Sequence, residues 1–137
     1  MHPFPFNFEL PCFLAGRTLN LRDATAIAAR LSDGLCSLGL DLSYCGLGES
    51  GVRAIMAGVP KKLGRLSLDF SQCRLERESV LAVAEHVPEG LTELIIDFDN
   101  NDVGEEGARA LAARLPAGLS SLNMNFFWRR HWRGWGA

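Results

Sequence analysis

The chain has 137 residues, of which 47% are hydrophobic and 22% are charged, and its formal net charge is -2. A chain of this length and apolar content can bury one substantial hydrophobic core. The small net charge excludes a bulk electrostatic attraction to nucleic acid or to an anionic membrane surface.

The N-terminal stretch MHPFPFNFELPCFLAG is apolar, but it lacks a basic region and is interrupted by Pro3, Pro5 and Pro11. It therefore does not resemble a secretory signal peptide. No stretch of the sequence is long and apolar enough for a membrane-spanning helix. The four cysteines form no CxxC pair, which favours a reducing compartment. We expect a protein of the cytoplasm or of another intracellular compartment.

Three similar stretches follow at a constant spacing of 28 residues: LGLDLSYCGL from Leu38, LSLDFSQCRL from Leu66 and LIIDFDNNDV from Leu94. Self-similarity at a period of about 20–50 residues is the signature of a repeat architecture. Apolar residues alternate with other residues in each stretch, which predicts a strand with one buried face. The aligned apolar columns are Leu35, Leu63, Leu91 and Leu119; Leu38, Leu66, Leu94 and Leu122; Leu40, Leu68, Ile96 and Met124; and Leu42, Phe70, Phe98 and Phe126.

A helix is predicted after each strand. In GEEGARALAARLPAGL, which begins at Gly104, Glu105 and Glu106 suit the first turn of a helix, and Pro116 with Gly118 is typical of a helix end. The apolar residues at helical spacing are Ala108, Leu111, Ala112 and Leu115. One strand–helix unit cannot bury both its apolar faces alone, so neighbouring units must stack and their strands form a parallel sheet.

The pattern weakens at both ends of the chain. Before Leu35, we align Leu10, Cys12 and Leu14 with Leu38, Leu40 and Leu42, and Leu19, Ile27 and Leu31 with Leu47, Ile55 and Val59. We predict a degenerate N-terminal capping repeat in residues 1–34, three full repeats in 35–118, and an incomplete fourth repeat with an irregular aromatic and basic tail in 119–137. The tail sequence WRRHWRGW could stack on bases or lie at a membrane interface, but an altered or truncated chain end explains it more simply.

The recurring pattern, with a helix between its copies, resembles the leucine-rich repeat. Its 28-residue unit resembles the ribonuclease-inhibitor-like class of that family, over about residues 10–126. Residues that match the family motif L-x-L-x-x-(N/C)-x-L are Leu68, Phe70, Cys73 and Leu75 in one unit and Ile96, Phe98, Asn101 and Val103 in the next. The resemblance implies an α/β solenoid with a parallel sheet on the concave side and helices on the convex side. It also implies a concave binding surface and no reaction common to the family.

The stretch GLGESG, from Gly46 to Gly51, fits the dinucleotide-binding pattern G-x-G-x-x-G between a strand and a helix. Its equivalents in the later units are RLERES and DVGEEG. The glycines therefore belong to the turn of the repeat, and Glu49 would place a carboxylate beside a pyrophosphate. We predict no cofactor.

A metal site or catalytic centre is not predicted either. Cys45 and Cys73 share a column with Asn101, which is the family's ladder position inside the turn, and they lack the paired spacing of zinc ligands. The histidines His2 and His86, with His131 in the tail, are scattered along the sequence. We therefore predict a protein that is not an enzyme.

One outward strand column is polar, and the repeat pattern itself gives no folding reason for it: Asp41, Asp69, Asp97 and Asn125. Neighbouring strands lie about 4.8 Å apart, so these carboxylates would form a ladder of like charges that repel one another. Further polar positions beside this column are Ser67, Ser71 and Asp99. Either the acids are solvated or bonded to neighbouring hydroxyls, or they meet a basic partner.

We predict a non-enzymatic protein–protein interaction module with a concave, partly acidic surface that binds a protein with a basic surface. We predict no small-molecule substrate, nucleic acid or membrane as a partner. Two alternatives stay open: a regulatory subunit or fragment that acts on a GTPase, similar to the Ran GTPase-activating family with this repeat class, and a purely structural spacer.

Overall fold

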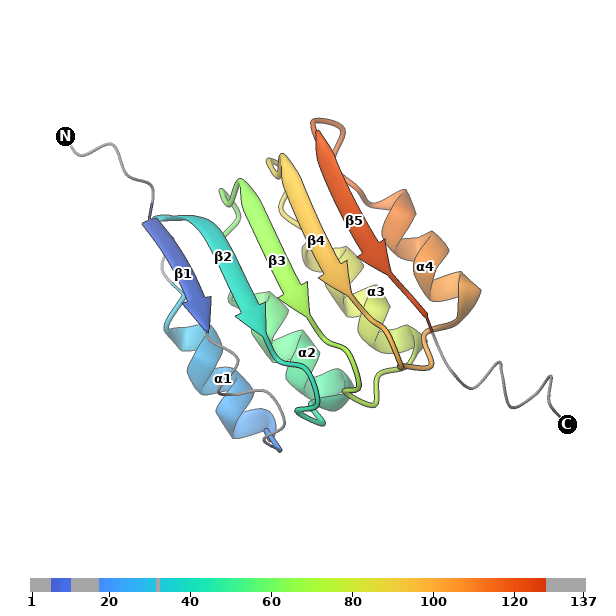
Figure 1. Ribbon diagram of the computed structural model, residues 1–137. Coiled ribbons are helices and arrows are strands. Elements are labelled where there is room, and N and C mark those ends of the chain that lie inside the picture. The colour runs from blue at the N-terminus through green and yellow to red at the C-terminus, as the bar shows by residue number, and fades with distance from the viewer. Residues whose placement is uncertain (1–5, 11–17, 32, 128–137) are drawn as a thin grey trace, which may run out of the picture.

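The computed structural model describes residues 6–10, 18–31 and 33–127, in which five strands and four helices alternate (Figure 1). The elements are β1 (Phe6–Leu10), α1 (Leu21–Ala29), β2 (Leu35–Asp41), α2 (Gly48–Ala57), β3 (Arg65–Asp69), α3 (Arg77–His86), β4 (Glu93–Asp97), α4 (Gly104–Ala113) and β5 (Ser121–Asn125).

The strands form one sheet in the order β1-β2-β3-β4-β5, and every neighbouring pair is parallel. The four helices lie side by side on one face of this sheet (Figure 1). Strands are spaced by about 4.8 Å, whereas packed helices need about 8–10 Å. The stack therefore curves with the sheet on its inner, concave side, and the predicted α/β solenoid is confirmed.

The core lies between the sheet and the helices. Leu68, Phe70, Ile96 and Phe98, all predicted to face inward, are buried. The ring of Phe98 stacks on Phe70 with centroids 5.8 Å apart and on Phe126 with centroids 5.5 Å apart. A row of aromatic rings thus runs along the stacking direction, just after the C-terminal ends of the last three described strands.

The pairing of β1 differs from the prediction. The sequence pattern aligns Leu10 with Leu38, but in the sheet Leu10 pairs with Leu40. The strand is therefore shifted by two residues. Cys12 and Leu14, which the pattern assigns to the same inward columns, lie outside the described residues.

The helical part of the first unit keeps the predicted offset, because Leu19 is buried as its counterpart Leu47 is. Leu19 follows Leu10 by nine positions, whereas Leu47 follows Leu40 by seven. The first unit thus has two extra residues between its strand and its helix, which explains the shift.

The aromatic row gives a test of the core. Replacing Phe70 by Ala should lower the free energy of unfolding by about 3–5 kcal/mol, because a large buried side chain is lost and a cavity remains. The control is Phe126→Ala, which should cost less because Phe126 is only partly buried. Urea unfolding measures both, and equal losses would contradict the different burial of the two rings.

Candidate functional site

The residues of the sheet that point away from the helices form rows across the strands. Strand register places them as Ser37, Arg65, Glu93 and Ser121; Gly39, Ser67, Ile95 and Asn123; and Asp41, Asp69, Asp97 and Asn125. We call the last set the aspartate row. The structure brings together the aspartate row and, in the adjacent row, Ser67. Ser71 and Asp99 lie two positions beyond the ends of β3 and β4.

Each acid of the aspartate row shapes the turn that follows its own strand. Oδ1 of Asp41 accepts hydrogen bonds from the backbone N–H and the hydroxyl of Ser43, at 3.2 and 2.7 Å. Oδ1 of Asp69 accepts the same two bonds from Ser71, at 3.0 and 2.6 Å. This side-chain bond to the backbone two residues ahead is the usual Asx turn. One oxygen of each carboxylate is therefore used within the fold.

The third acid has a different neighbour. Oδ1 of Asp97 accepts the backbone N–H of Asp99 at 2.9 Å, but the Asp99 carboxylate has no hydroxyl to donate. Burial raises the pKa of Asp97, the bond from the Asp99 N–H opposes this rise, and the charges of Asp99 and Asp69 add to it. Negative charge is therefore most crowded at this end of the aspartate row.

No ion pair within residues 6–10, 18–31 and 33–127 neutralises the aspartate row. Every ion pair there joins an arginine to a glutamate, as in Arg65–Glu93 at 3.2 Å on the same face of the sheet. The carboxylates of the aspartate row thus keep their negative charge available to a partner, since none of the six pairs uses them.

A shallow hollow of about 210 Å³ lies on the same face, between the aspartate row and the strand starts. Ser37, Gly39, Ser67 and Ile95 line it, together with the Arg65–Glu93 pair. Gly39 has no side chain to fill the space above the sheet, and Ile95 is 38% exposed. The hollow therefore has room for a partner's side chain, with Ile95 as its apolar part and two serines and an ion pair as its polar part.

The ladder position behind this face is buried and fully bonded. Oδ1 of Asn101 accepts the backbone N–H groups of Cys73 and Leu75 at 2.9 and 3.0 Å. Its Nδ2 donates to the carbonyl oxygens of Phe70 and Phe98 at 2.8 and 3.1 Å. One side chain thus holds two successive turns together, as the family resemblance implied.

Cys73 has the equivalent role in the preceding unit. Its thiol donates to the carbonyl oxygen of Leu42 at 2.8 Å. Burial, the largest cause, raises the pKa of this thiol to about 11. A buried thiol with a raised pKa is a poor nucleophile and a poor metal ligand, so the chemistry of Cys73 is structural.

The glycine motif is explained by turn geometry. Gly46 and Gly48 have φ values of 60° and 69°, and their equivalents Arg74 and Gly104 have 62° and 70°. A Cβ on Gly51 would lie 2.9 Å from Cδ2 of Leu47. Each glycine therefore has a conformational or packing reason to be there.

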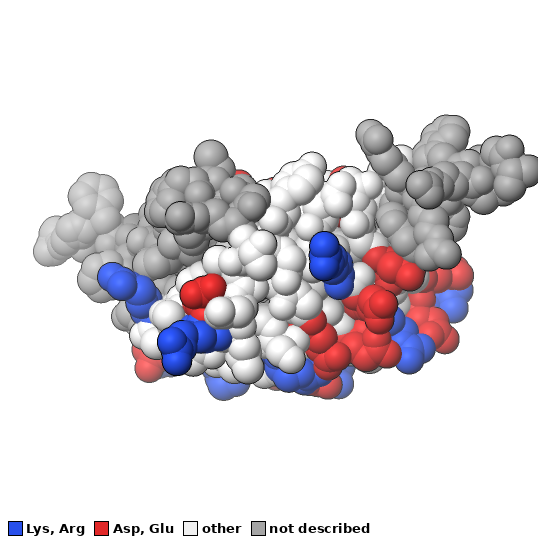
Figure 2. Space-filling model, turned by 90° about the horizontal axis from the view of Figure 1, so that it is seen from below, with Lys and Arg blue, Asp and Glu red and all other residues white. Residues whose placement is uncertain are grey.

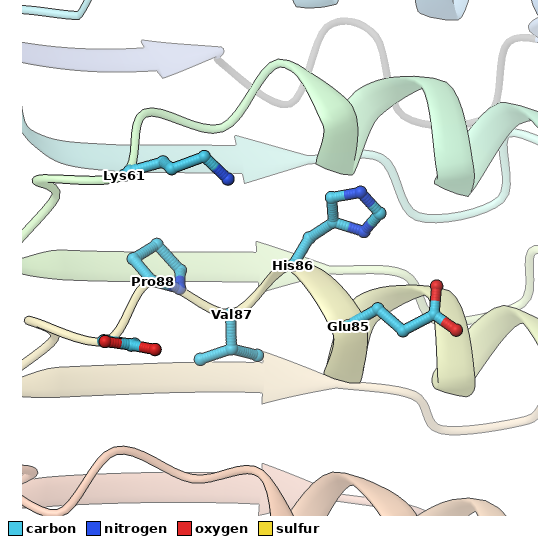
Figure 3. A pocket seen from close by; sticks show the side chains of 6 residues that line it. Lys61, Glu85, His86, Val87 and Pro88 are labelled. Atoms are coloured by element: carbon cyan, nitrogen blue, oxygen red, sulfur yellow. The ribbon is translucent and has the colours of Figure 1, made fainter.

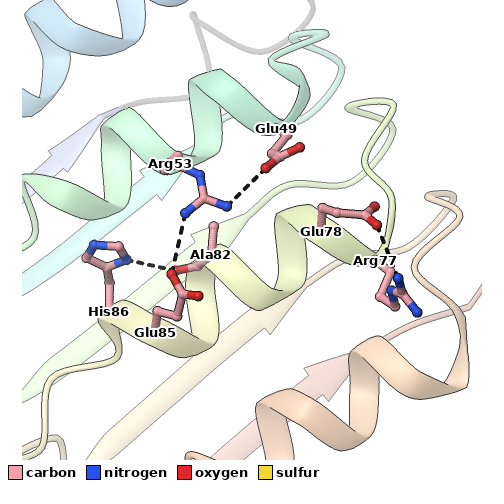
Figure 4. A network of polar contacts seen from close by, with 7 residues as sticks. All are labelled: Glu49, Arg53, Arg77, Glu78, Ala82, Glu85 and His86. Carbon is pink, nitrogen blue, oxygen red and sulfur yellow. Dashed lines mark hydrogen bonds and ion pairs between the residues drawn. The ribbon is translucent and has the colours of Figure 1, made fainter.

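A second hollow, of about 330 Å³, lies at the C-terminal end of α3 and includes Lys61 and His86 (Figure 3). Nδ1 of His86 lies 2.9 Å from the carbonyl oxygen of Ala82, and Glu85 is paired with Arg53 (Figure 4). Within the described ranges, no three His, Cys, Asp or Glu side chains are placed to hold a metal ion. We assign no chemistry to this hollow.

Charged side chains are unevenly distributed along the edge of the molecule where the strands end and the helices begin. Acidic side chains gather there toward α3 and α4, while Lys and Arg are scattered (Figure 2). Part of this charge is Glu78, Glu105 and Glu106 in the first turns of these helices, where negative charge favours the helix dipole. Within the part of the chain that the structure describes, none of the helices has the length and apolar character of a membrane span.

Parallel strands that repeat every 28 positions, each followed by a helix on the same face, define a solenoid repeat protein. The family model described as Leucine Rich repeat matches residues 38–56, from β2 into α2, and residues 91–112, from β4 into α4. The two matched segments are leucine-rich repeats, and the arrangement of the described strands and helices fits that family. No curated protein gives a significant match to it.

The ladder residue gives a test of the turn. Replacing Asn101 by Ala should lower the free energy of unfolding by about 2–4 kcal/mol, because buried donors and acceptors lose their partner. The control is Asn101→Cys, which should lose less, since cysteine occupies this column at 45 and 73. Urea unfolding distinguishes the two variants. An Ala variant as stable as the Cys variant would contradict the bonding role.

The raised pKa of Asp97 gives a pH test. The folded chain holds this proton more tightly than the unfolded chain does. The resulting stability is fully present below the unfolded-state pKa and is lost as the pH rises through the raised pKa of the folded state. Asp97→Asn keeps the Oδ1 acceptor and removes the charge, so it should be more stable than the parent at neutral pH.

Thermal unfolding from about pH 3 to pH 7 measures this difference. The stability advantage of Asp97→Asn over the parent should grow as the pH rises. Asp97→Ala is the control, because it removes the acceptor as well and should lower stability at every pH. A parent and an Asn variant that differ equally at all pH values would refute the assignment.

Proposed function

We propose that this protein is a non-enzymatic interaction module whose concave sheet face binds a protein with a basic surface. Leucine-rich repeat domains generally mediate protein–protein interaction. Beyond this general role, we assign the concave sheet face as the binding surface and a positive charge to the partner. The observation that carries it is the aspartate row, whose acids lie on neighbouring strands without a cation from the described residues.

Electrostatic complementarity supports the choice of partner. Each acid uses Oδ1 in its turn, and no described donor bonds its Oδ2. A Lys or Arg side chain that reaches two neighbouring carboxylates would relieve their mutual repulsion, and Arg can do so with two parallel hydrogen bonds. A basic partner therefore gains more binding free energy at the aspartate row than a neutral partner does.

Apolar anchor points lie on both sides of the row. In the hollow over Gly39, the exposed side chain of Ile95 offers one apolar contact among polar lining residues. Tyr44, which follows β2, is 58% exposed and is held at a φ of 60°. Tyrosine is enriched at protein interfaces because its ring offers a large apolar area at low entropic cost. Apolar anchors around a charged row are typical of a specific interface.

The finer classification belongs to the same proposal. Strand pairing at a constant offset of 28 residues supports the ribonuclease-inhibitor-like class. The thiol of Cys73 donates a hydrogen bond inside the turn, which requires the reduced form and supports an intracellular setting. No residue in the described ranges gives specific support to the GTPase alternative.

A displayed peptide library selected against the intact chain tests the proposal. Enriched peptides should carry Lys or Arg, and the combined variant Asp41→Asn, Asp69→Asn and Asp97→Asn should raise their dissociation constants at least about tenfold. Added salt should weaken binding to the parent chain. The variant should stay folded, because Asn keeps each Oδ1 acceptor.

The matched control changes the same number of charges at exposed positions outside the five described strands: Asp33→Asn, Glu76→Gln and Glu89→Gln. This control should bind the peptides as the parent does. A spacer would enrich no peptide family. Equal binding by the parent and the triple Asn variant would exclude the aspartate row as the site.

A further inference from the structure

The last described unit of the stack exposes side chains whose counterparts in the two preceding units are buried. Leu94 on β4 is 0% exposed, but its counterpart Leu122 on β5 is 44% exposed. Ala84 on α3 is buried, whereas its counterpart Ala112 on α4 is exposed. The reason is that β5 and α4 have no described unit beside them. We call this surface the end face; it comprises Leu122, Met124 and Phe126 from the β5 side and Ala108, Arg109 and Ala112 from α4.

The edge of β5 is open for pairing. Its sequence SLNMN contains no charged residue and no proline, although such residues are what usually protects an exposed strand edge. The backbone N–H of Phe98 donates to the carbonyl oxygen of Asn125 at 2.8 Å. No such bond is found for Phe126 within the described residues, so the hydrogen-bond ladder stops at an unprotected edge.

On α4, beside this edge, Arg109 makes one of the two ion pairs that its counterpart Arg53 makes on α2. On α2, Arg53 bonds to Glu49 in its own helix at 3.0 Å and to Glu85 on the next helix at 3.4 Å (Figure 4). Its counterpart on α4 is Arg109, which bonds to Glu105 in its own helix at 2.9 Å. Within the described ranges Arg109 has no second carboxylate, so the end face offers a cation where α2 uses one to bind its neighbour.

We propose that the end face binds a further strand–helix unit of the same repeat type, with its strand parallel to β5 and an acidic residue placed as Glu85 is. The junctions between the described units show which residues such a unit needs. Glu85 pairs with the arginine of the preceding helix, and a small residue allows close helix approach, as at Gly107, where an added Cβ would lie 3.4 Å from Cβ of Val80.

A second copy of this chain fits the end face less well. In a head-to-tail stack, its first helix would lie against α4. The residue of α1 equivalent to Glu85 is Ala29, which offers no carboxylate to Arg109. Charge complementarity therefore favours a unit that resembles α3 and β4 over another copy of the N-terminal end.

An insertion into the full chain tests the proposal. A second copy of residues 72–99, which contains α3 and β4, is inserted directly after Phe127, and the remaining chain is retained. The insert places a copy of Glu85 opposite Arg109 and a copy of Ser79 opposite Ala108. We expect the melting temperature to rise by roughly 5 °C or more and hydrogen exchange at the Phe126 amide to slow at least about tenfold.

Two controls isolate the charge. An insert copied from residues 44–71 has Ala57 in place of the acid, and it should give a smaller rise in melting temperature. Glu85→Arg in the first insert should also reduce the rise, and adding Arg109→Glu in the body of the chain should restore it.

Two outcomes would overturn the proposal. In the first, neither insert changes the melting temperature or the exchange of the Phe126 amide. In the second, the chain without an insert forms a dimer in sedimentation, and Phe126 becomes protected as the dimer forms. The second result would assign the end face to another copy of the chain.

Discussion

Every unit of this protein depends on a neighbour to bury the apolar side of its strand and helix. The columns through Leu66, Leu94 and Phe98 are buried because another strand and another helix lie on each side. The ladder residue Asn101 adds polar bonds across the same junction, from one turn to the previous one. Apolar burial supplies the driving force, and the asparagine fixes the relative position of successive turns.

The same constraint separates binding from stability. All inward positions are taken by packing, so variation is left to the outward rows and to the turns. The aspartate row lies in an outward row and also takes part in the turns. Asp41 and Asp69 each use one carboxylate oxygen in a turn and keep their charge on the open face of the sheet. A residue with two such roles tolerates loss of its charge better than loss of its oxygen, since the turn needs only an acceptor.

The period of the sequence predicted most of the fold, because each apolar column recurs at the same offset and only one arrangement buries all of them. It failed in the first unit, where Leu10 pairs with Leu40. Apolar residues are frequent enough there to fit more than one register, and the two extra residues before Leu19 have no pattern of their own. For the candidate site, the sequence placed the acids in one row. It could not show the exposure of Tyr44 or the hollow over Gly39, which depend on the shape of the surface.

The stacked arrangement also makes this protein elastically compliant. Among the described elements, helices contact mainly the next helix and strands the next strand, so no contact between distant units fixes the spacing of the first and last of them. A small rotation at each junction adds to the others, and the curvature of the sheet can open or tighten without loss of any single contact. The spacing between outer residues of the concave face is therefore adjustable, while the spacing between neighbours such as Asp69 and Asp97 stays that of a hydrogen-bonded sheet.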